Sequence, residues 1–351
     1  MTIQVLGYAA QSATTDLEPY RFERRDPRAN DVTIDILYCG VCHSDVHSAR
    51  NDWGGATYPM VPGHEIIGRV ASVGTAVTRF KPGDAVGVGC MVDSCQQCFS
   101  CDSGDEQYCE HRATYTYNAI DRHDGMPTQG GYSERIVVSD RFVLKLPDGL
   151  DLAGAAPLLC AGITTWSPLR HWKVGAGSRV AVIGLGGLGH MGLKLAKALG
   201  AHVTLFTRSP GKEADARRLG ADEIILSTDD AQMATAERRF DLIIDTVPYV
   251  HDLNPYLPTL AVNGTLVLVG YLGGLEPALG TVPMIMGRKS VAGSLIGGIA
   301  ETQELLDFCG EHGIAADVEM IPIQAINESY ERMLKSDVKY RFVIDMASLK
   351  A

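Results

Sequence analysis

A glycine-rich turn at residues 184–189 constrains the fold more than any other feature of the sequence. It follows an apolar run, Val180 to Ile183, and precedes a helix-like stretch at residues 190–199. In this context the first glycine of a G-x-G-x-x-G motif permits a tight turn, the second lets a pyrophosphate approach the backbone, and the third lets the helix pack on the strand. The helix N-terminus then faces the phosphates. We therefore predict a Rossmann dinucleotide-binding domain whose cofactor-binding residues include Gly184, Leu185, Gly186, Gly187, Leu188 and Gly189.

The pattern of the chain changes near residue 151. Before it, short β-rich runs alternate with turns, which is typical of a small barrel or sandwich. After it, strand and helix patterns alternate as in a doubly wound parallel sheet, and we expect strands at 179–183, 202–207, 223–226, 242–245, 265–269 and 290–295. A chain of 351 residues favours two domains. We predict an α/β protein with a β-rich domain in residues 1–155, a Rossmann domain in 156–298, and a segment, 299–351, that returns to the first domain.

The charge and the composition of the chain limit the kinds of partner that we expect it to have. The formal net charge is −11, and the basic residues form no long cluster, so we expect no nucleic-acid partner. The first residues lack the pattern of a secretory signal, and no run approaches the roughly 20 apolar residues of a membrane span. We therefore expect a cytoplasmic protein that acts on small molecules and has no membrane partner.

Five of the nine cysteines fall between residues 90 and 109. Four of them form a C-x2-C-x2-C-x7-C pattern, a spacing that can surround one tetrahedral zinc ion and leave no position open. Iron–sulfur clusters use similar spacings, but nothing else in the sequence indicates electron transfer. Disulfide frameworks belong to short secreted chains. The pattern predicts a structural zinc site at Cys95, Cys98, Cys101 and Cys109.

Three further candidates for metal ligands are dispersed: Cys42, His64 and Cys160. A lone cysteine or histidine is usually a packed or surface residue. A catalytic zinc ion, however, takes three protein ligands and keeps a fourth position open for water or substrate, and two cysteines with one histidine form such a set.

The sequence resembles the cinnamyl alcohol dehydrogenase branch of the zinc-containing medium-chain dehydrogenases over nearly its whole length. The matching motifs are Gly40-Val-Cys-His-Ser-Asp45, Pro62-Gly-His-Glu65, the four-cysteine loop, Leu158-Leu-Cys-Ala-Gly-Ile-Thr-Thr165, the glycine-rich turn, Ile296-Gly-Gly-Ile-Ala-Glu-Thr-Gln303 and Tyr340-Arg-Phe-Val-Ile-Asp345. They occur in the expected order in both predicted domains. The resemblance implies a GroES-like catalytic domain beside the Rossmann domain, and two zinc ions per chain.

The resemblance also implies roles for individual residues. Cys42, His64 and Cys160 would bind the catalytic zinc, with Glu65 as a neighbouring or alternate ligand. Asp45 would accept a proton from His64 and fix its tautomer. Ser44 would hydrogen-bond the reacting oxygen, and His47 would pass its proton to solvent. An ordinary solvated histidine is the alternative for His47. Cys39, Cys90 and Cys309 are interpreted as structural.

The end of the second Rossmann strand predicts the choice of cofactor. NAD enzymes usually place Asp or Glu there to hold the ribose hydroxyls. This chain has Thr207, Arg208, Ser209 and, slightly later, Lys212, which could bind a 2′-phosphate. We therefore expect NADP(H). The alternative is that the basic residues only solvate a loop.

Taken together, these features predict an NADP(H)-linked alcohol dehydrogenase or aldehyde reductase for primary, aromatic or medium-chain substrates, with Trp53 and Ile296 as substrate contacts. An NAD-linked polyol or secondary-alcohol dehydrogenase is the rival enzyme, and a non-catalytic zinc or nucleotide-binding protein is the rival of another class. The resemblance favours a homodimer joined through residues 290–295.

Overall fold

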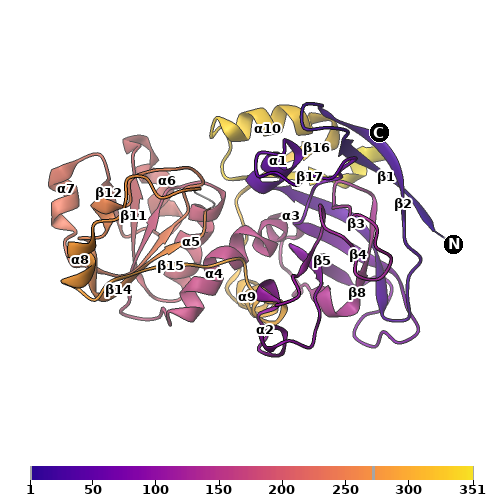
Figure 1. Cartoon of the computed structure of the whole chain (residues 1–351), viewed down its shortest axis with the longest axis horizontal. Helices are drawn as coiled ribbons and strands as arrows, with labels where there is room; N and C mark the ends of the chain where they lie inside the picture. Colours follow the sequence, from indigo (N-terminus) through magenta and orange to yellow (C-terminus); the bar gives the residue numbers. More distant parts are fainter. Residues whose placement is uncertain (1, 271–272, 351) are drawn as a thin grey trace. The chain divides into compact units, whose positions relative to one another are not determined.

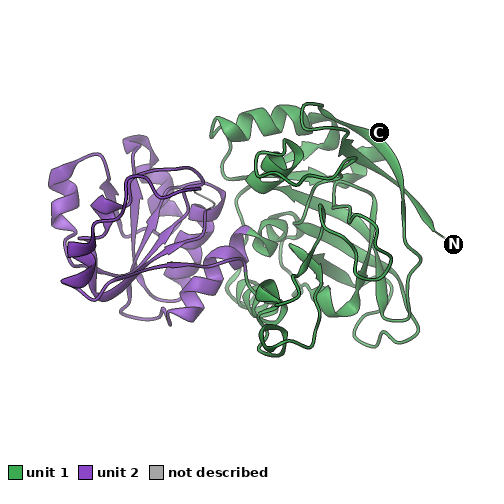
Figure 2. Cartoon of the chain, in the orientation of Figure 1, with its two compact units in different colours: residues 1–160, 297–351 green, residues 161–296 purple. Residues whose placement is uncertain are grey.

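The computed structural model describes residues 2–270 and 273–350 and divides the chain into two compact units. The first unit combines residues 1–160 with residues 297–351, and the second is the continuous stretch 161–296 (Figure 2). The C-terminal segment therefore belongs to the same unit as the N-terminal half of the chain.

The second unit is built on a parallel six-stranded sheet (Figure 1). Its strands, in spatial order, are β12 (Glu223–Leu226), β11 (His202–Thr207), β10 (Arg179–Ile183), β13 (Phe240–Asp245), β14 (Leu260–Leu268) and β15 (Ser290–Gly293). Its helices are α4 (Ala161–His171), α5 (Gly187–Ala198), α6 (Glu213–Arg218), α7 (Asp230–Thr235) and α8 (Thr281–Ile285). The strand order reverses at β10, which carries the glycine-rich turn at its carboxyl end. In open α/β sheets such a reversal point is where ligands bind.

The six strands occur where the sequence predicts them, with differences at their ends. β13 begins two residues earlier than expected, and β14 begins at Leu260 and not at Thr265. The segment Asn263-Gly264 resembles a turn in sequence, and Asn263 does adopt a positive φ of 65°. Pairing with β13 nevertheless continues on both sides of a register shift between Phe240 and Leu242.

The first unit contains a seven-stranded sheet, with two-stranded sheets beside it. Its path is β16 (Val318–Pro322), β17 (Arg341–Asp345), β3 (Asp31–Val41), β4 (Ile66–Val73), β5 (Ala85–Val88) and β9 (Leu144–Lys145), and β8 (Arg135–Ser139) also pairs with β3. The smaller pairs are β1 (Ile3–Ala10) with β2 (Leu17–Arg24) and β6 (Met91–Asp93) with β7 (Thr114–Tyr115). Because β17 lies between β16 and β3, the end of the chain completes this sheet.

Short helices join the strands of the first unit. They are α1 (His43–Ala49), α2 (Phe99–Asp102), α3 (Leu152–Ala155), α9 (Ile299–His312) and α10 (Ile326–Leu334). Helix α9 begins against the loop that precedes β7: the Ile299 N–H donates to Glu106 Oε2 at 3.0 Å. A Cβ atom on Gly298 would lie 1.7 Å from the Gly104 carbonyl oxygen, so only glycine fits at this approach.

Within residues 2–270 and 273–350, no single helix is both long and apolar enough to cross a membrane. One bent pair of helices, Leu152–Leu159 with Ala161–His171, passes that test by length and composition alone.

Candidate metal centres and nucleotide site

The four cysteines of the loop between β6 and β7 converge on one point. The sulfur atoms of Cys95, Cys98, Cys101 and Cys109 all lie within 4.8 Å of one another. Cys95 Sγ is 3.9 Å from Cys101 Sγ, close to the ~3.8 Å between two thiolates that share a tetrahedral zinc ion at about 2.3 Å. A disulfide would require about 2.05 Å. The geometry therefore fits a closed zinc site, which we call the closed cluster.

The backbone around the closed cluster favours thiolates, the form of cysteine that binds metal. The Cys95 N–H donates to Cys109 Sγ and the Glu110 N–H donates to Cys98 Sγ, both at 3.4 Å. Hydrogen bonds from the N–H groups of Cys101 and Glu110 lower the pKa of Cys98 to about 6. Burial and the neighbouring sulfurs raise the pKa values of Cys95 and Cys101, so the backbone stabilises negative charge at Cys98 in particular.

A second group of ligands, which we call the open cluster, is assembled from three distant segments of the first unit. Cys42 follows β3 at the start of α1, His64 and Glu65 directly precede β4, and Cys160 follows the 3₁₀ turn Ala156–Leu159. Their ligand atoms lie within 4.8 Å of one another. Cys42 Sγ is 3.9 Å from Cys160 Sγ, again the separation of two thiolates on one zinc ion and not that of a disulfide. Two sulfurs and one imidazole leave a fourth position for a ligand.

The fully buried carboxylate of Asp45 organises the open cluster. Its Oδ1 lies 3.0 Å from His64 Nδ1 and accepts from the Gly63 N–H at 3.1 Å. Its Oδ2 accepts from the Cys42 N–H at 2.8 Å and from the Tyr132 hydroxyl at 3.2 Å. Burial opposes a charge on His64, but Asp45, together with Cys90 and Cys42, outweighs this effect and raises the pKa of the ring. Because Asp45 contacts His64 Nδ1, the other ring nitrogen, Nε2, is left to bind a metal. The contact also makes the ring a stronger metal ligand.

Glu65 belongs to the open cluster by distance but is held by an arginine. Arg341, on β17, donates from Nε and Nη2 to the two carboxylate oxygens at 3.2 and 2.5 Å. Both side chains are at least 97% buried. Burial raises the pKa of Glu65 to about 7, against the influence of Arg341. A Cβ on Gly40 would lie 1.9 Å from Glu65 Oε2, so this glycine makes room for the pair.

The other residues proposed for catalysis lie on or next to α1. Ser44 is partly buried and occupies the first turn, two residues after Cys42. His47 Nδ1 is 2.8 Å from Asp52 Oδ2, and its ring centroid is 5.2 Å from that of Trp53, which is 45% exposed. Ile296, predicted as a second substrate contact, is the last residue of the second unit and has a positive φ of 36°.

In the second unit, the glycine-rich turn adopts the form that the motif predicts. Gly184 has a φ of 90°, and a Cβ on Gly189 would lie 2.2 Å from the Gly184 carbonyl oxygen, so both positions require glycine. A Cβ on Gly186 would meet nothing within 4 Å. Gly186 is also the N-cap of α5, and this open backbone at a helix N-terminus fits a pyrophosphate.

The residues predicted to select the cofactor lie beside this turn. The Gly184 N–H donates to the Phe206 carbonyl oxygen at 3.0 Å, which places the ends of β10 and β11 together. Thr207 Oγ1 accepts from the Ser209 N–H at 3.1 Å, Arg208 is exposed, and Lys212 Nζ donates to the Leu185 carbonyl oxygen at 3.1 Å. Residues 207–212, from the end of β11 onward, therefore offer hydroxyls and cations next to the phosphate site and contain no carboxylate, which fits a 2′-phosphate.

Three residues that surround the open cluster, Arg341, Tyr132 and Tyr117, were not predicted from the sequence. Arg341 lies in the motif Tyr340-Arg-Phe-Val-Ile-Asp345. An arginine within this otherwise apolar strand could have indicated a buried ion pair. Tyr132 binds Asp45, and the Tyr117 ring stacks on His64 with centroids 5.7 Å apart. Neither tyrosine has a local sequence signal. Cys90, interpreted as structural and without a partner, lies next to the cluster: its Sγ donates to the carbonyl oxygen of Leu159, the residue before Cys160, at 3.8 Å.

Comparisons with known proteins agree with this description. Residues 28–148 match the family described as alcohol dehydrogenase GroES-like domain, and residues 187–311 match zinc-binding dehydrogenase. The aldehyde reductase YahK of Escherichia coli (strain K12) is 53% identical over 350 residues, covering 99% of each chain. A cinnamyl alcohol dehydrogenase structure from Sorghum bicolor superposes with a TM-score of 0.95 at 48% identity, covering 98% of each chain. The crystal structure of CAD from Helicobacter pylori complexed with NADP(H) superposes with a TM-score of 0.92 at 43% sequence identity, covering 99% of each chain.

The chain therefore belongs to the zinc-containing medium-chain alcohol dehydrogenases, in the branch that resembles cinnamyl alcohol dehydrogenases. The predicted fold class, a GroES-like domain with a Rossmann domain, is confirmed.

Proposed function

We propose that this protein is a zinc-dependent alcohol dehydrogenase that interconverts primary alcohols and aldehydes, aromatic or of medium chain length, with NADP(H). The observation that carries the proposal is the open cluster, in which two sulfurs and one imidazole converge beside a buried orienting carboxylate. The relatives named aldehyde reductase and cinnamyl alcohol dehydrogenase support the reaction class. The first unit would carry the metal chemistry and the second the nucleotide.

Residues of the open cluster would prepare the site for the reaction. When bound, zinc supplies a Lewis acid for the substrate oxygen, and NADP(H) donates or accepts the hydride. Cys42, His64 and Cys160 would hold the ion, and Asp45 keeps the proton on His64 Nδ1. Ser44 Oγ would accept the proton of the alcohol hydroxyl, and His47, paired with Asp52, would exchange it with solvent. The closed cluster would hold a second, structural zinc ion.

Cofactor choice provides a sharp test of the nucleotide site. Arg208→Ala should lower kcat/KM for NADPH by roughly tenfold to a hundredfold, since a charge-assisted hydrogen bond contributes about 1.5–3 kcal/mol, and should change that for NADH little. Lys194→Ala, in α5, is a matched control. The full screen pairs a set of aldehydes with each cofactor. A wild-type preference for NADH, or an equal effect of Arg208→Ala on both, would refute the NADP(H) assignment. Failure to reduce any aldehyde would refute the reaction.

We also propose that the protein is a cytoplasmic homodimer. All nine cysteines are free thiols, and a reducing compartment would keep the ligands of both clusters available for metal. β15 is an edge strand of the second unit's sheet, and Val282, Ile285 and Met286, in and after α8, expose 68, 75 and 77% of their surface. Pairing of this edge with a second copy would cover both the open strand and these apolar side chains. Light scattering of the purified protein tests the assembly.

A further inference from the structure

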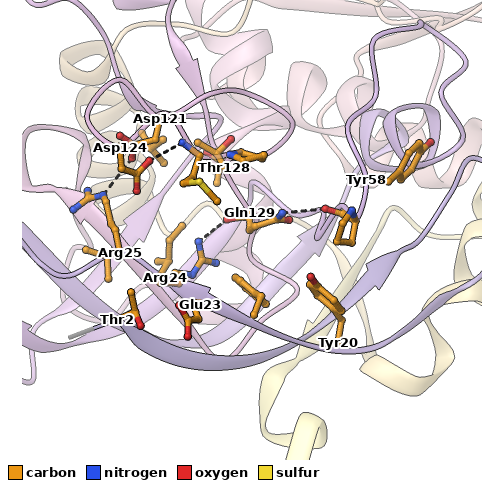
Figure 3. A pocket seen from close by; sticks show the side chains of 18 residues that line it. Thr2, Tyr20, Glu23, Arg24, Arg25, Tyr58, Asp121, Asp124, Thr128 and Gln129 are labelled. Atoms are coloured by element: carbon orange, nitrogen blue, oxygen red, sulfur yellow. Dashed lines mark hydrogen bonds and ion pairs between the residues drawn. The ribbon is translucent and has the colours of Figure 1, made fainter.

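Arg24, the last residue of β2, lies in the wall of a cavity of about 620 Å³ in the first unit (Figure 3). Its guanidinium donates only to neutral acceptors, which are the carbonyl oxygens of Arg135 at 2.7 Å, Gln129 at 2.7 Å and Gly130 at 2.8 Å, and Ser133 Oγ at 2.9 Å. Among the described residues it forms no ion pair. Burial, reinforced by Arg25, lowers the pKa of Arg24, yet an arginine keeps its charge in proteins. Because the guanidinium has no counter-ion among the described residues, its positive charge is stabilised by these four hydrogen bonds.

The acceptors of Arg24 belong to one loop, residues 129–135, which we call the Arg24 loop. Its Gln129 side chain and that of the preceding residue, Thr128, border the cavity (Figure 3). The guanidinium, whose planar fork reaches several carbonyls at once, fixes the loop in its place.

The Arg24 loop is also bound to the segment 61–63, which leads directly into His64. Four hydrogen bonds join them: Gly130 N–H to Val61 O at 2.6 Å, Gly131 N–H to Gly63 O at 2.8 Å, Tyr132 N–H to Pro62 O at 3.0 Å, and Val61 N–H to Gln129 Oε1 at 2.7 Å. The backbones approach so closely that a Cβ on Gly130 would lie 2.3 Å from the Pro62 carbonyl oxygen. A shift of the loop would therefore displace this segment.

The same loop also reaches the partner of His64. The Tyr132 hydroxyl donates to Asp45 Oδ2 at 3.2 Å, and Gly63, held by the loop, donates to Asp45 Oδ1 at 3.1 Å. Both the backbone that carries His64 and the carboxylate that orients its ring thus rest on the Arg24 loop.

We propose that Arg24 is a positioning residue for the metal site: by holding residues 129–135 it fixes His64 and Asp45 in the geometry that retains the catalytic ion. The proposal rests on the proposed function in that the open cluster must bind zinc. It assigns Arg24 no contact with substrate, cofactor or metal.

Zinc release to a chromophoric chelator tests the proposal without turnover. In Arg24→Lys the ammonium group cannot reproduce the planar fork, so one zinc ion should leave about tenfold faster, as when a residue that supports a metal ligand is altered. The ion of the closed cluster should leave at the wild-type rate. Arg21→Lys, at an exposed position of the same strand, is the matched control and should release both ions as wild type does. Equal acceleration of both ions, or of neither, would overturn the proposal.

Further variants and amide exchange keep the proposal testable if Arg24→Lys folds poorly. They also distinguish a positioning role of Arg24 from a general effect on protein stability. Ser133→Ala removes one of the four acceptors of Arg24, together with the hydrogen bond from the hydroxyl to the Gly130 carbonyl oxygen at 2.8 Å, and should accelerate release of the same ion by a smaller factor. In zinc-free protein, amide exchange at Val61, Gly63 and His64 should be faster in Arg24→Lys than in wild type. The double variant Arg24→Lys/Tyr132→Phe should show less than the product of the single effects, because both act through one loop. Multiplicative effects, or unchanged exchange at Val61, Gly63 and His64, would assign Arg24 a general structural role. Wild type that releases zinc as expected but reduces no aldehyde would refute the proposed function and leave this proposal intact.

Discussion

The closed and open clusters use similar ligand chemistry but are assembled over very different lengths of chain. The closed cluster takes four sulfurs from residues 95–109, whereas the open cluster draws its ligands from residues 42, 64, 65 and 160. The first needs only its own loop. The second needs β3, β4 and the segment before α4 to be in place at once. One ion would therefore stabilise a local structure, and binding of the other depends on the fold of the whole unit.

The groups that support the two clusters differ in the same respect: those of the closed cluster are local in sequence, and those of the open cluster are distant. Backbone N–H groups of the loop itself support the sulfurs of the closed cluster. The open cluster depends on Asp45, Tyr132 and Arg341, side chains from three separate segments. A site that must keep a position open for substrate cannot be shaped by its ligands alone, so more distant groups set its geometry.

The largest expected effect follows loss of an open-cluster ligand. Cys160→Ala should lower kcat/KM by about 10³-fold or more, because the substrate oxygen loses its Lewis acid. Zinc content should fall from two ions per chain to one while the circular dichroism spectrum stays unchanged. Cys309→Ala, at a buried cysteine outside both clusters, is the control. Substantial remaining activity would remove Cys160 from the catalytic set.

Loss of a closed-cluster ligand should affect stability more than chemistry. Cys95→Ser should also leave one zinc ion per chain, but its main effect should be a Tm lower by about 10 °C, since loss of a structural metal costs several kcal/mol. At low temperature the folded protein should retain kcat/KM within a few-fold of wild type. If the variant still binds two ions, the closed-cluster assignment is wrong.

Removing the carboxylate charge that orients His64 should weaken zinc binding at the open cluster and leave the closed cluster unchanged. The loss of activity should be smaller than that caused by removing a zinc ligand. Asp45→Asn preserves shape but loses the carboxylate, and should weaken the catalytic zinc or activity by about 10- to 100-fold. Metal competition titrations would follow each ion separately. Asp16→Asn, an exposed acid, serves as the control. A matching loss of affinity at the closed cluster would contradict the independence of the two sites.

The smallest effect is expected where the closed-cluster loop touches α9. Glu106→Ala removes the acceptor for the first N–H of that helix, at a cost of about 1 kcal/mol, or a Tm shift of about 2–4 °C. Zinc content should remain at two ions per chain. Glu110→Ala, an exposed acid of the same loop, should shift Tm less. Equal shifts in the two variants would show that the contact contributes nothing specific.

The contrast between the clusters also explains what the sequence could predict. The closed cluster and the glycine-rich turn are local patterns, so their spacing alone predicts their geometry. The six Rossmann strands were recognisable because strands buried on both faces are continuous apolar runs. The open cluster required resemblance to a known family, since no spacing rule joins Cys42 to Cys160.

The residues that support the open cluster were not predictable by either route. Arg341 lies 276 positions from Glu65, and Tyr132 lies 87 positions from Asp45. Only the folded sheet brings them together. Arg24 is a similar case, because an arginine that ends an amphipathic strand resembles any surface residue until its acceptors are seen.

The place of β17 between β16 and β3 has a consequence for synthesis of the chain. The second unit is continuous, so it can close as soon as residue 296 has left the ribosome. The first unit, although its N-terminal half is made first, lacks an interior strand until residues 341–345 emerge. Domains usually fold in the order in which they are translated, and we expect that order to be reversed in this chain. Nascent chains arrested before residue 340 should contain a protease-resistant second unit and a digestible first one. The buried Glu65 carboxylate meets its guanidinium partner only after residues 341–345 have been made, so we expect the open cluster to bind its ion after these residues and not before.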